Sequence, residues 1–90
     1  MSELHMPISM EWSKEEVIDA VNFFQTVERA HHKAVPREDI LALYNRFKEI
    51  VPSKSEEKQL FRTFDERAEV SCWQAVQAAK KAEPGEKVKL

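Results

Sequence analysis

The sequence predicts an all-α fold, a compact bundle of about four short helices with an extended N-terminal arm. The first observation is that the 90 residues include a single glycine, Gly85, whereas β-sandwiches and barrels use glycine and asparagine at their many turns. The second is that apolar residues recur at helical spacing in successive segments. The third is that a capping serine or a proline stands at the start of each segment, where helices prefer such residues.

Composition narrows the class of protein further. With 42% hydrophobic and 33% charged residues, the chain is too apolar for disorder and has no apolar run of membrane-spanning length, so we expect one soluble globular domain. The 14 basic and 16 acidic residues are interspersed and leave a net charge of −2, which disfavours membrane surfaces and nonspecific nucleic-acid binding. Cys72 is the single cysteine, and the N-terminus lacks the pattern of a signal peptide. Both features predict a cytoplasmic protein.

Residues 1–12 are expected to form the arm. Apolar residues alternate with other residues from Leu4 to Trp12, a spacing that turns one face of an extended chain toward a core. Pro7 is incompatible with the interior of a helix. We therefore expect this segment to be extended and to pack on the helical core.

The first helix is predicted over about residues 14–32. Ser13 and Glu16 have the spacing of a capping box, in which each side chain accepts a hydrogen bond from the backbone amide of the other. Thr26 falls on the side predicted to face solvent. The predicted buried stripe consists of Val17, Val21, Phe24, Glu28 and His31, and Ala20 and Val27 widen it.

The second helix is predicted over 36–51. Pro36 suits its first turn, where a missing amide hydrogen costs nothing, and Pro52 ends it. The residues that share its apolar face are Ile40, Leu43, Tyr44, Phe47, Ile50 and Val51.

Two further serines predict the third and fourth helices, over 54–67 and 72–83. Ser53 and Ser71 each stand three residues before a glutamate or glutamine, the spacing of a capping box. The helices thus form a single domain over 13–84, and residues 85–90 are predicted to be a charged tail.

Several blocks of the sequence are distinctive, namely Pro7-Ile8, Trp12 to Glu16, Val21 to Phe24, Phe47 to Lys58, and Ala75-Val76 followed by Ala79-Lys80. These blocks resemble one known family, uncharacterised protein family (UPF) two-two-three, small helical proteins of Bacillus-like bacteria. The resemblance covers nearly the whole chain. It implies a compact helical fold and a cytoplasmic bacterial protein with no assigned reaction, cofactor or partner.

The residues that could support chemistry each have a simpler structural explanation. Glu28 and His31 have the Glu-x-x-His spacing of carboxylate-bridged metal sites, but the chain lacks the second such pair that these sites need. Cys72 follows the Ser71 cap, where a helix N-terminus lowers a thiol pKa, yet it lies on an apolar stripe and we expect a small buried side chain. We therefore predict no catalytic residues, no metal and no cofactor, and no enzyme activity.

A possible anion site lies at the start of the third helix. Its free backbone amides and the hydroxyl of Ser53 could hold a phosphate or sulfate, and Lys54, Lys58 and Arg62 extend the positive charge along one side. Against this interpretation, Ser53 can simply cap the helix, and the glutamates that follow repel an anion. A nucleic-acid partner is disfavoured because base-stacking aromatic residues are not interleaved with these cations.

Some large apolar residues fall off the predicted stripes, so they either widen the core or form a surface for a partner. The residues predicted for such an interaction surface are Phe23, Leu41 and Trp73. Because no catalytic or metal pattern stands out, the favoured hypothesis is a non-catalytic protein–protein interaction module that binds an unknown protein or itself. The alternative is a small anion or nucleic-acid binder that uses Lys54, Lys58 and Arg62.

Overall fold

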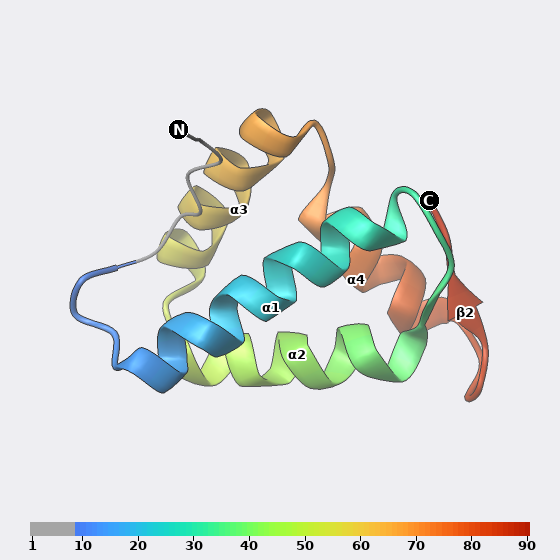
Figure 1. The fold of residues 1–90 in the computed structure, drawn as a ribbon, viewed down its shortest axis with the longest axis horizontal. Helices are drawn as coiled ribbons and strands as arrows, with labels where there is room; N and C mark the ends of the chain where they lie inside the picture. The colour runs from blue at the N-terminus through green and yellow to red at the C-terminus, as the bar shows by residue number, and fades with distance from the viewer. Residues whose placement is uncertain (1–8) are drawn as a thin grey trace.

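A computed structural model describes residues 9–90, which form four helices and two short strands (Figure 1). The all-α fold class with about four helices is therefore confirmed. Residues 1–8 of the predicted arm lie outside the described residues. The elements are α1 (Lys14–Ala30), β1 (Val35–Pro36), α2 (Arg37–Ile50), α3 (Lys54–Ala68), α4 (Cys72–Lys81) and β2 (Lys87–Val88).

The predicted caps all form, although only one is a complete box in the described part of the chain. Ser13 accepts from the Glu16 amide at 3.1 Å, and its own amide donates to the Glu16 carboxylate at 2.9 Å. Ser53 and Ser71 supply only the first half, by accepting from the amides three residues later. The predictions of complete boxes at these two serines were therefore wrong.

The second helix begins one residue later than predicted. Pro36 is its N-cap rather than its first residue, because its backbone is extended and pairs in the short strand β1. The Arg37 amide, left without a partner inside the helix, donates to the Glu86 carbonyl at 3.0 Å. The C-terminal segment thus supplies the cap that no side chain at Pro36 can provide.

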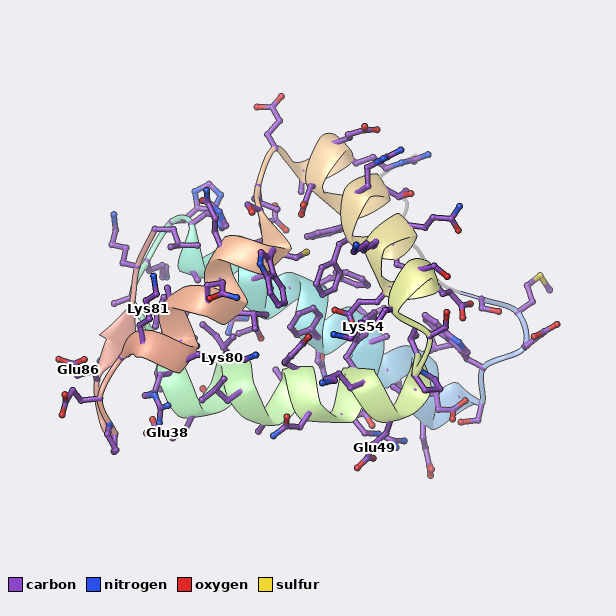
Figure 2. All side chains as sticks on the ribbon, turned by 180° about the vertical axis from the view of Figure 1, so that it is seen from behind. Glu38, Glu49, Lys54, Lys80, Lys81 and Glu86 are labelled. Atoms are coloured by element: carbon purple, nitrogen blue, oxygen red, sulfur yellow. The ribbon has the colours of Figure 1, made fainter. Side chains whose placement is uncertain are left out.

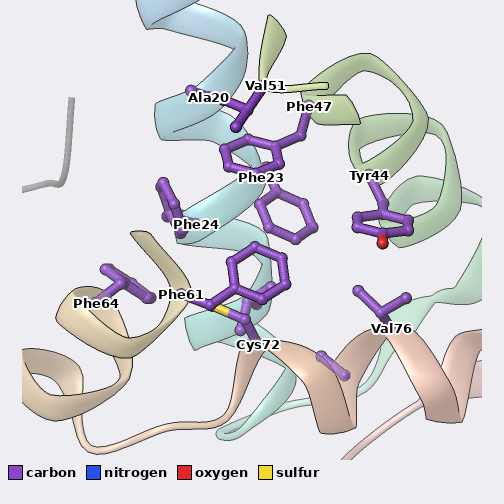
Figure 3. Packing of buried hydrophobic residues seen from close by; sticks show 12 residues of the cluster. Ala20, Phe23, Phe24, Tyr44, Phe47, Val51, Phe61, Phe64, Cys72 and Val76 are labelled. Carbon is purple, nitrogen blue, oxygen red and sulfur yellow. The ribbon is translucent and has the colours of Figure 1, made fainter. Parts of the chain in front are cut away.

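Phe23 lies at the centre of the main hydrophobic core (Figure 3). Its ring centroid is 5.2 Å from that of Phe47 and 5.7 Å from that of Phe61, and both pairs are stacked. Its placement on an exposed interaction surface was therefore wrong, as was the placement of Thr26 on the solvated side. The reason is that α2 and α4 both pack on α1, which widens and rotates its buried face. The residues that α1 buries are Ala20, Phe23, Phe24, Thr26, Val27 and Ala30.

A smaller core cluster orders the C-terminal segment, which the sequence analysis treated as a charged tail. Strand β2 pairs antiparallel with β1, with Val35 opposite Val88, at the end of the molecule away from α3 (Figure 1). Val88 is buried in this cluster, and the Leu90 amide donates to the Ala30 carbonyl at 2.9 Å. Because an unpaired backbone would cost free energy there, these bonds hold the segment on the domain.

Leu41 packs partly buried against the same cluster. Its side chain therefore supports the attachment of the C-terminal segment, whereas Phe23 belongs to the main core. Within residues 9–90, no helix is both long and apolar enough to cross a membrane.

Candidate functional site

A cleft of about 570 Å³ lies between α3 and the start of α4, over one side of α2. Its size falls within the range of about 300–1,000 Å³ that is typical of ligand-binding clefts. Three aromatic residues come to it from three different helices, and charged residues of α3 form the rest of its lining. The aromatic residues are Tyr44, Phe61 and Trp73, and the charged residues are Lys54, Glu57, Lys58, Arg62, Asp65 and Glu66.

Trp73 is the most exposed aromatic residue of this cleft, with 46% of its surface accessible. It follows Cys72 at the start of α4, whose buried stripe faces the core and leaves the indole on the flank toward α3. The ring meets Tyr44 edge-on at a centroid distance of 6.5 Å. The Lys80 ammonium lies 5.5 Å from the indole centroid, within reach of a cation–π interaction (Figure 2 labels Lys80).

Tyr44 joins the cleft to the core. Its ring packs near Phe23 and Phe61, and its hydroxyl donates to a Glu57 carboxylate oxygen at 3.1 Å. Burial, followed by the negative charge of Glu57 and this hydrogen bond, raises the pKa of Tyr44 to about 12. The hydroxyl is therefore a neutral donor at physiological pH and holds α2 and α3 together.

The structure brings the predicted cations into this cleft together with Trp73. Lys54, Lys58 and Arg62 all line it, whereas Ser53 caps α3 and is not part of the lining. Two predictions that the sequence analysis made separately, an apolar interaction surface and a line of cations, therefore fall on one site. Phe23 and Leu41 do not belong to it.

Asp65 uses one of its oxygens at the start of α4. It accepts from the Cys72 amide at 2.9 Å, one of the amides that a helix N-terminus leaves without an internal partner. Burial, with a further contribution from the Asp65 charge and hydrogen bond, raises the pKa of the Cys72 thiol well above its usual value. The thiol is fully buried and protonated, so it lacks the exposed thiolate that a nucleophile requires.

His31 has a structural position that its Glu-x-x-His spacing did not reveal. Its Nε2 accepts from the Ser71 amide at 3.2 Å, and because that amide can only donate, Nδ1 carries the proton and donates to the Val27 carbonyl at 3.0 Å. The imidazole thus ties the end of α1 to the start of α4. Glu28 is not among its hydrogen-bond partners, and residues 9–90 contain no group of three or more metal-binding side chains.

We did not predict from the sequence that Tyr44 and Phe61 line the cleft or that Lys80 lies beside Trp73. Tyr44 and Phe61 have the spacing of core residues, and they do reach the core, but each also exposes an edge to the cleft. Lys80 lies seven residues after Trp73, two turns along the same face of α4, and this spacing was the one available signal.

These features define a small all-helical domain with an aromatic cleft beside a line of cations. The chain belongs to the uncharacterised protein family UPF0223, whose model matches residues 3–88. A UPF0223 protein of Oceanobacillus iheyensis is 55% identical over 74 residues, which cover 82% of this chain and 84% of that protein. A UPF0223 protein of Lysinibacillus sphaericus is 44% identical over 88 residues, which cover 98% of this chain and 93% of that protein. One of Staphylococcus aureus is 42% identical over 87 residues, which cover 97% of this chain and 96% of that protein.

Proposed function

We propose that the protein is a non-catalytic, cytoplasmic interaction module that holds a segment of a partner protein in the cleft between α3 and α4. The observation that carries this proposal is the half-exposed Trp73 beside Tyr44 and Phe61, at a concave site of about 570 Å³. Tryptophan and tyrosine supply much of the binding energy at protein interfaces, because they bury a large area and lose little conformational freedom.

A non-catalytic role is supported by the state of the candidate nucleophile. Cys72 is buried and protonated, and both ring nitrogens of His31 are occupied by backbone groups. A histidine that acts as a general base needs a free ring nitrogen within reach of its substrate, which His31 does not offer. The unpaired, buried thiol also suits the reducing conditions of the cytoplasm.

The proposal is tested by capturing partners from the bacterium that encodes the protein, with three tagged forms. These are the wild type, Trp73→Ala, and Ile18→Ala as a matched control, since Ile18 is 48% exposed and lies on α1 outside the cleft. We expect the wild type and Ile18→Ala to retain the same partner and Trp73→Ala to lose it. A partner set that is identical for all three forms would refute the role of the cleft.

The alternative function, a small anion or nucleic-acid binder, is favoured by one observation, the position of Lys54, Lys58 and Arg62 on one cleft. Titration of a labelled single-stranded oligonucleotide at low salt tests it, since phosphate contacts strengthen as salt is lowered. Binding at micromolar protein that is weakened by Lys58→Glu would support this alternative. A titration in which the signal of the oligonucleotide does not change would exclude this alternative.

A further inference from the structure

The cations of the cleft are not neutralised by the residues that the structure describes. Lys54, Lys58 and Arg62 recur every fourth residue, which places them along one flank of α3 over about 12 Å. Within residues 9–90 none of the three forms an ion pair, whereas Arg46, on α2, contacts Asp19 at 2.8 Å and Glu49 at 3.2 Å. Within the described residues, these three cations are thus without an ion-pair partner, and carboxylates of a bound segment could pair with them.

Two more ammonium groups lie around the aromatic residues. The Lys48 and Lys80 nitrogens are 5.5 and 5.7 Å from the centroid of the Tyr44 ring, and Lys80 also lies near Trp73. Figure 2 shows Lys80 on α4 and Lys54 at the start of α3, so the cations come from separate elements around the site. The aromatic surface is therefore bordered by positive charge on more than one side.

The acidic residues of the cleft are largely engaged by donors of the protein itself. Glu57 accepts from the Tyr44 hydroxyl, and Asp65 accepts from the Cys72 amide. Of the lining carboxylates, Glu66 is the one for which the described residues provide no hydrogen bond. The lining itself has three basic and three acidic side chains, and Lys48 and Lys80 add two ammonium groups beside the Tyr44 ring, outside that lining.

From this charge distribution we infer that the cleft binds an acidic segment of its partner, in which glutamate or aspartate residues flank an apolar anchor. The anchor packs on Trp73 and Phe61, and the carboxylates lie along Lys54, Lys58 and Arg62. Charge complementarity of this kind speeds association and rejects partners of the wrong charge. The inference rests on the proposed function and adds the chemistry of the partner.

A nucleic acid fits the same cations less well. Stacking of successive bases requires several exposed aromatic faces, but Tyr44 and Phe61 are only 5% and 7% exposed, which leaves Trp73 as the one exposed ring of the cleft lining. Glu57, Asp65 and Glu66 on the same cleft repel a continuous phosphate backbone. A peptide, in contrast, can place neutral residues opposite these carboxylates.

The test uses the full chain with Trp12→Phe, which leaves Trp73 as the single tryptophan and its fluorescence as the reporter. The probes are three short synthetic peptides without tryptophan or tyrosine, each with the same phenylalanine and leucine anchor. Their flanks are made of glutamate, of serine or of lysine. A single-stranded oligonucleotide is the fourth probe, and each titration is repeated at low and high salt because screening weakens exposed charge pairs.

We expect the glutamate peptide to bind at least about tenfold more tightly than the lysine peptide at low salt, with a smaller difference at high salt. Lys58→Glu should weaken binding of the glutamate peptide by about three- to tenfold. Lys14→Glu makes the same charge change on α1 outside the cleft and should alter it by less than about twofold.

Equal affinity for the three peptides would overturn the acidic partner but leave the interaction module intact, provided that Trp73→Ala still loses the captured partner. Tighter binding of the oligonucleotide than of the glutamate peptide would overturn it in favour of a nucleic acid. Loss of Trp73-dependent capture, by contrast, removes the proposed function itself.

Discussion

The position of Phe23 gives the sharpest prediction about stability. The side chain is fully buried, and its ring lies within 6 Å of the rings of Phe24, Tyr44, Phe47 and Phe61. Truncation of such a residue removes its burial and leaves a cavity, which costs about 3–5 kcal/mol. A domain of this size has a total stability of roughly 5–13 kcal/mol, so Phe23→Ala should remove a large part of it.

The assay is urea unfolding followed by far-ultraviolet circular dichroism. With a slope of about 1–1.5 kcal/mol per molar urea for a small domain, the unfolding midpoint should fall by about 2 M or more. Phe23→Leu, which keeps part of the side chain, should cost about 1–2 kcal/mol and gives a measurable value even if the alanine variant does not fold. Trp73→Ala is the control, because its half-exposed ring should cost less than half as much as Phe23→Ala.

A loss below about 1 kcal/mol for Phe23→Ala would refute this account of the core. Equal losses for Phe23→Ala and Trp73→Ala would also contradict it, because the two residues would then share one environment. Either result would favour the sequence-based prediction that Phe23 is part of an interaction surface.

Three further predictions concern individual contacts. His31→Ala should lower the free energy of unfolding by about 1–2 kcal/mol, because the partly buried Ser71 amide loses its acceptor. His32→Ala, at an exposed position, should change it by less than about 0.5 kcal/mol. Faster hydrogen exchange at Ser71 is the second readout, and equal effects of the two variants would contradict the link between α1 and α4. At alkaline pH the folded protein holds its protons more tightly than the unfolded chain, because burial raises the pKa of Cys72 and raises that of Tyr44 to about 12. The free energy of unfolding should therefore fall as pH rises above about 8.5 for Cys72 and between about 10 and 12 for Tyr44, by at most ~1.4 kcal/mol per pH unit for each group. Urea titrations of Cys72→Ala and Tyr44→Phe should show the corresponding part of this loss removed, and slopes equal to that of the wild type would count against the assignment. Val88→Ala should lower the free energy of unfolding, measured by urea titration, by about 1–2 kcal/mol, because Val88 is buried in the smaller core cluster. Lys89→Ala, at an exposed position, should lower it by less than about 0.5 kcal/mol. Equal losses for the two variants would mean that this cluster does not hold the C-terminal segment.

The helix boundaries can be predicted well from the sequence because local interactions determine them. Ser13, Ser53 and Ser71 cap the helices that they were predicted to cap, and each helix ends within two residues of its predicted end. The buried face of α1 was harder to predict from the sequence, because it depends on which helices pack on α1. Phe23 and Thr26 lie on a flank that is buried only when other helices pack on it, and Phe61 of α3 stacks on the Phe23 ring there.

In the candidate site, too, local features could be predicted from the sequence and long-range placement could not. Trp73 was predicted as a surface residue and Lys54, Lys58 and Arg62 as a line of cations, each from its position on its own helix. Their meeting in one cleft depends on the turn at Glu69, whose left-handed backbone (φ 58°) ends α3 and redirects the chain into α4. Long-range placement of this kind has no signature in local spacing, and for the same reason Tyr44 was assigned to the core alone.

The most direct test of the central claim is photo-crosslinking from inside the cleft in living cells. Glu66 is exposed and lines the cleft, so we replace it with p-benzoylphenylalanine, and place the same group at Ile18 on α1 as the control. We expect a discrete adduct from position 66 that is absent from position 18 and is lost when Trp73→Ala is added. The same adducts from both positions, or an adduct from position 66 that Trp73→Ala leaves unchanged, would contradict it.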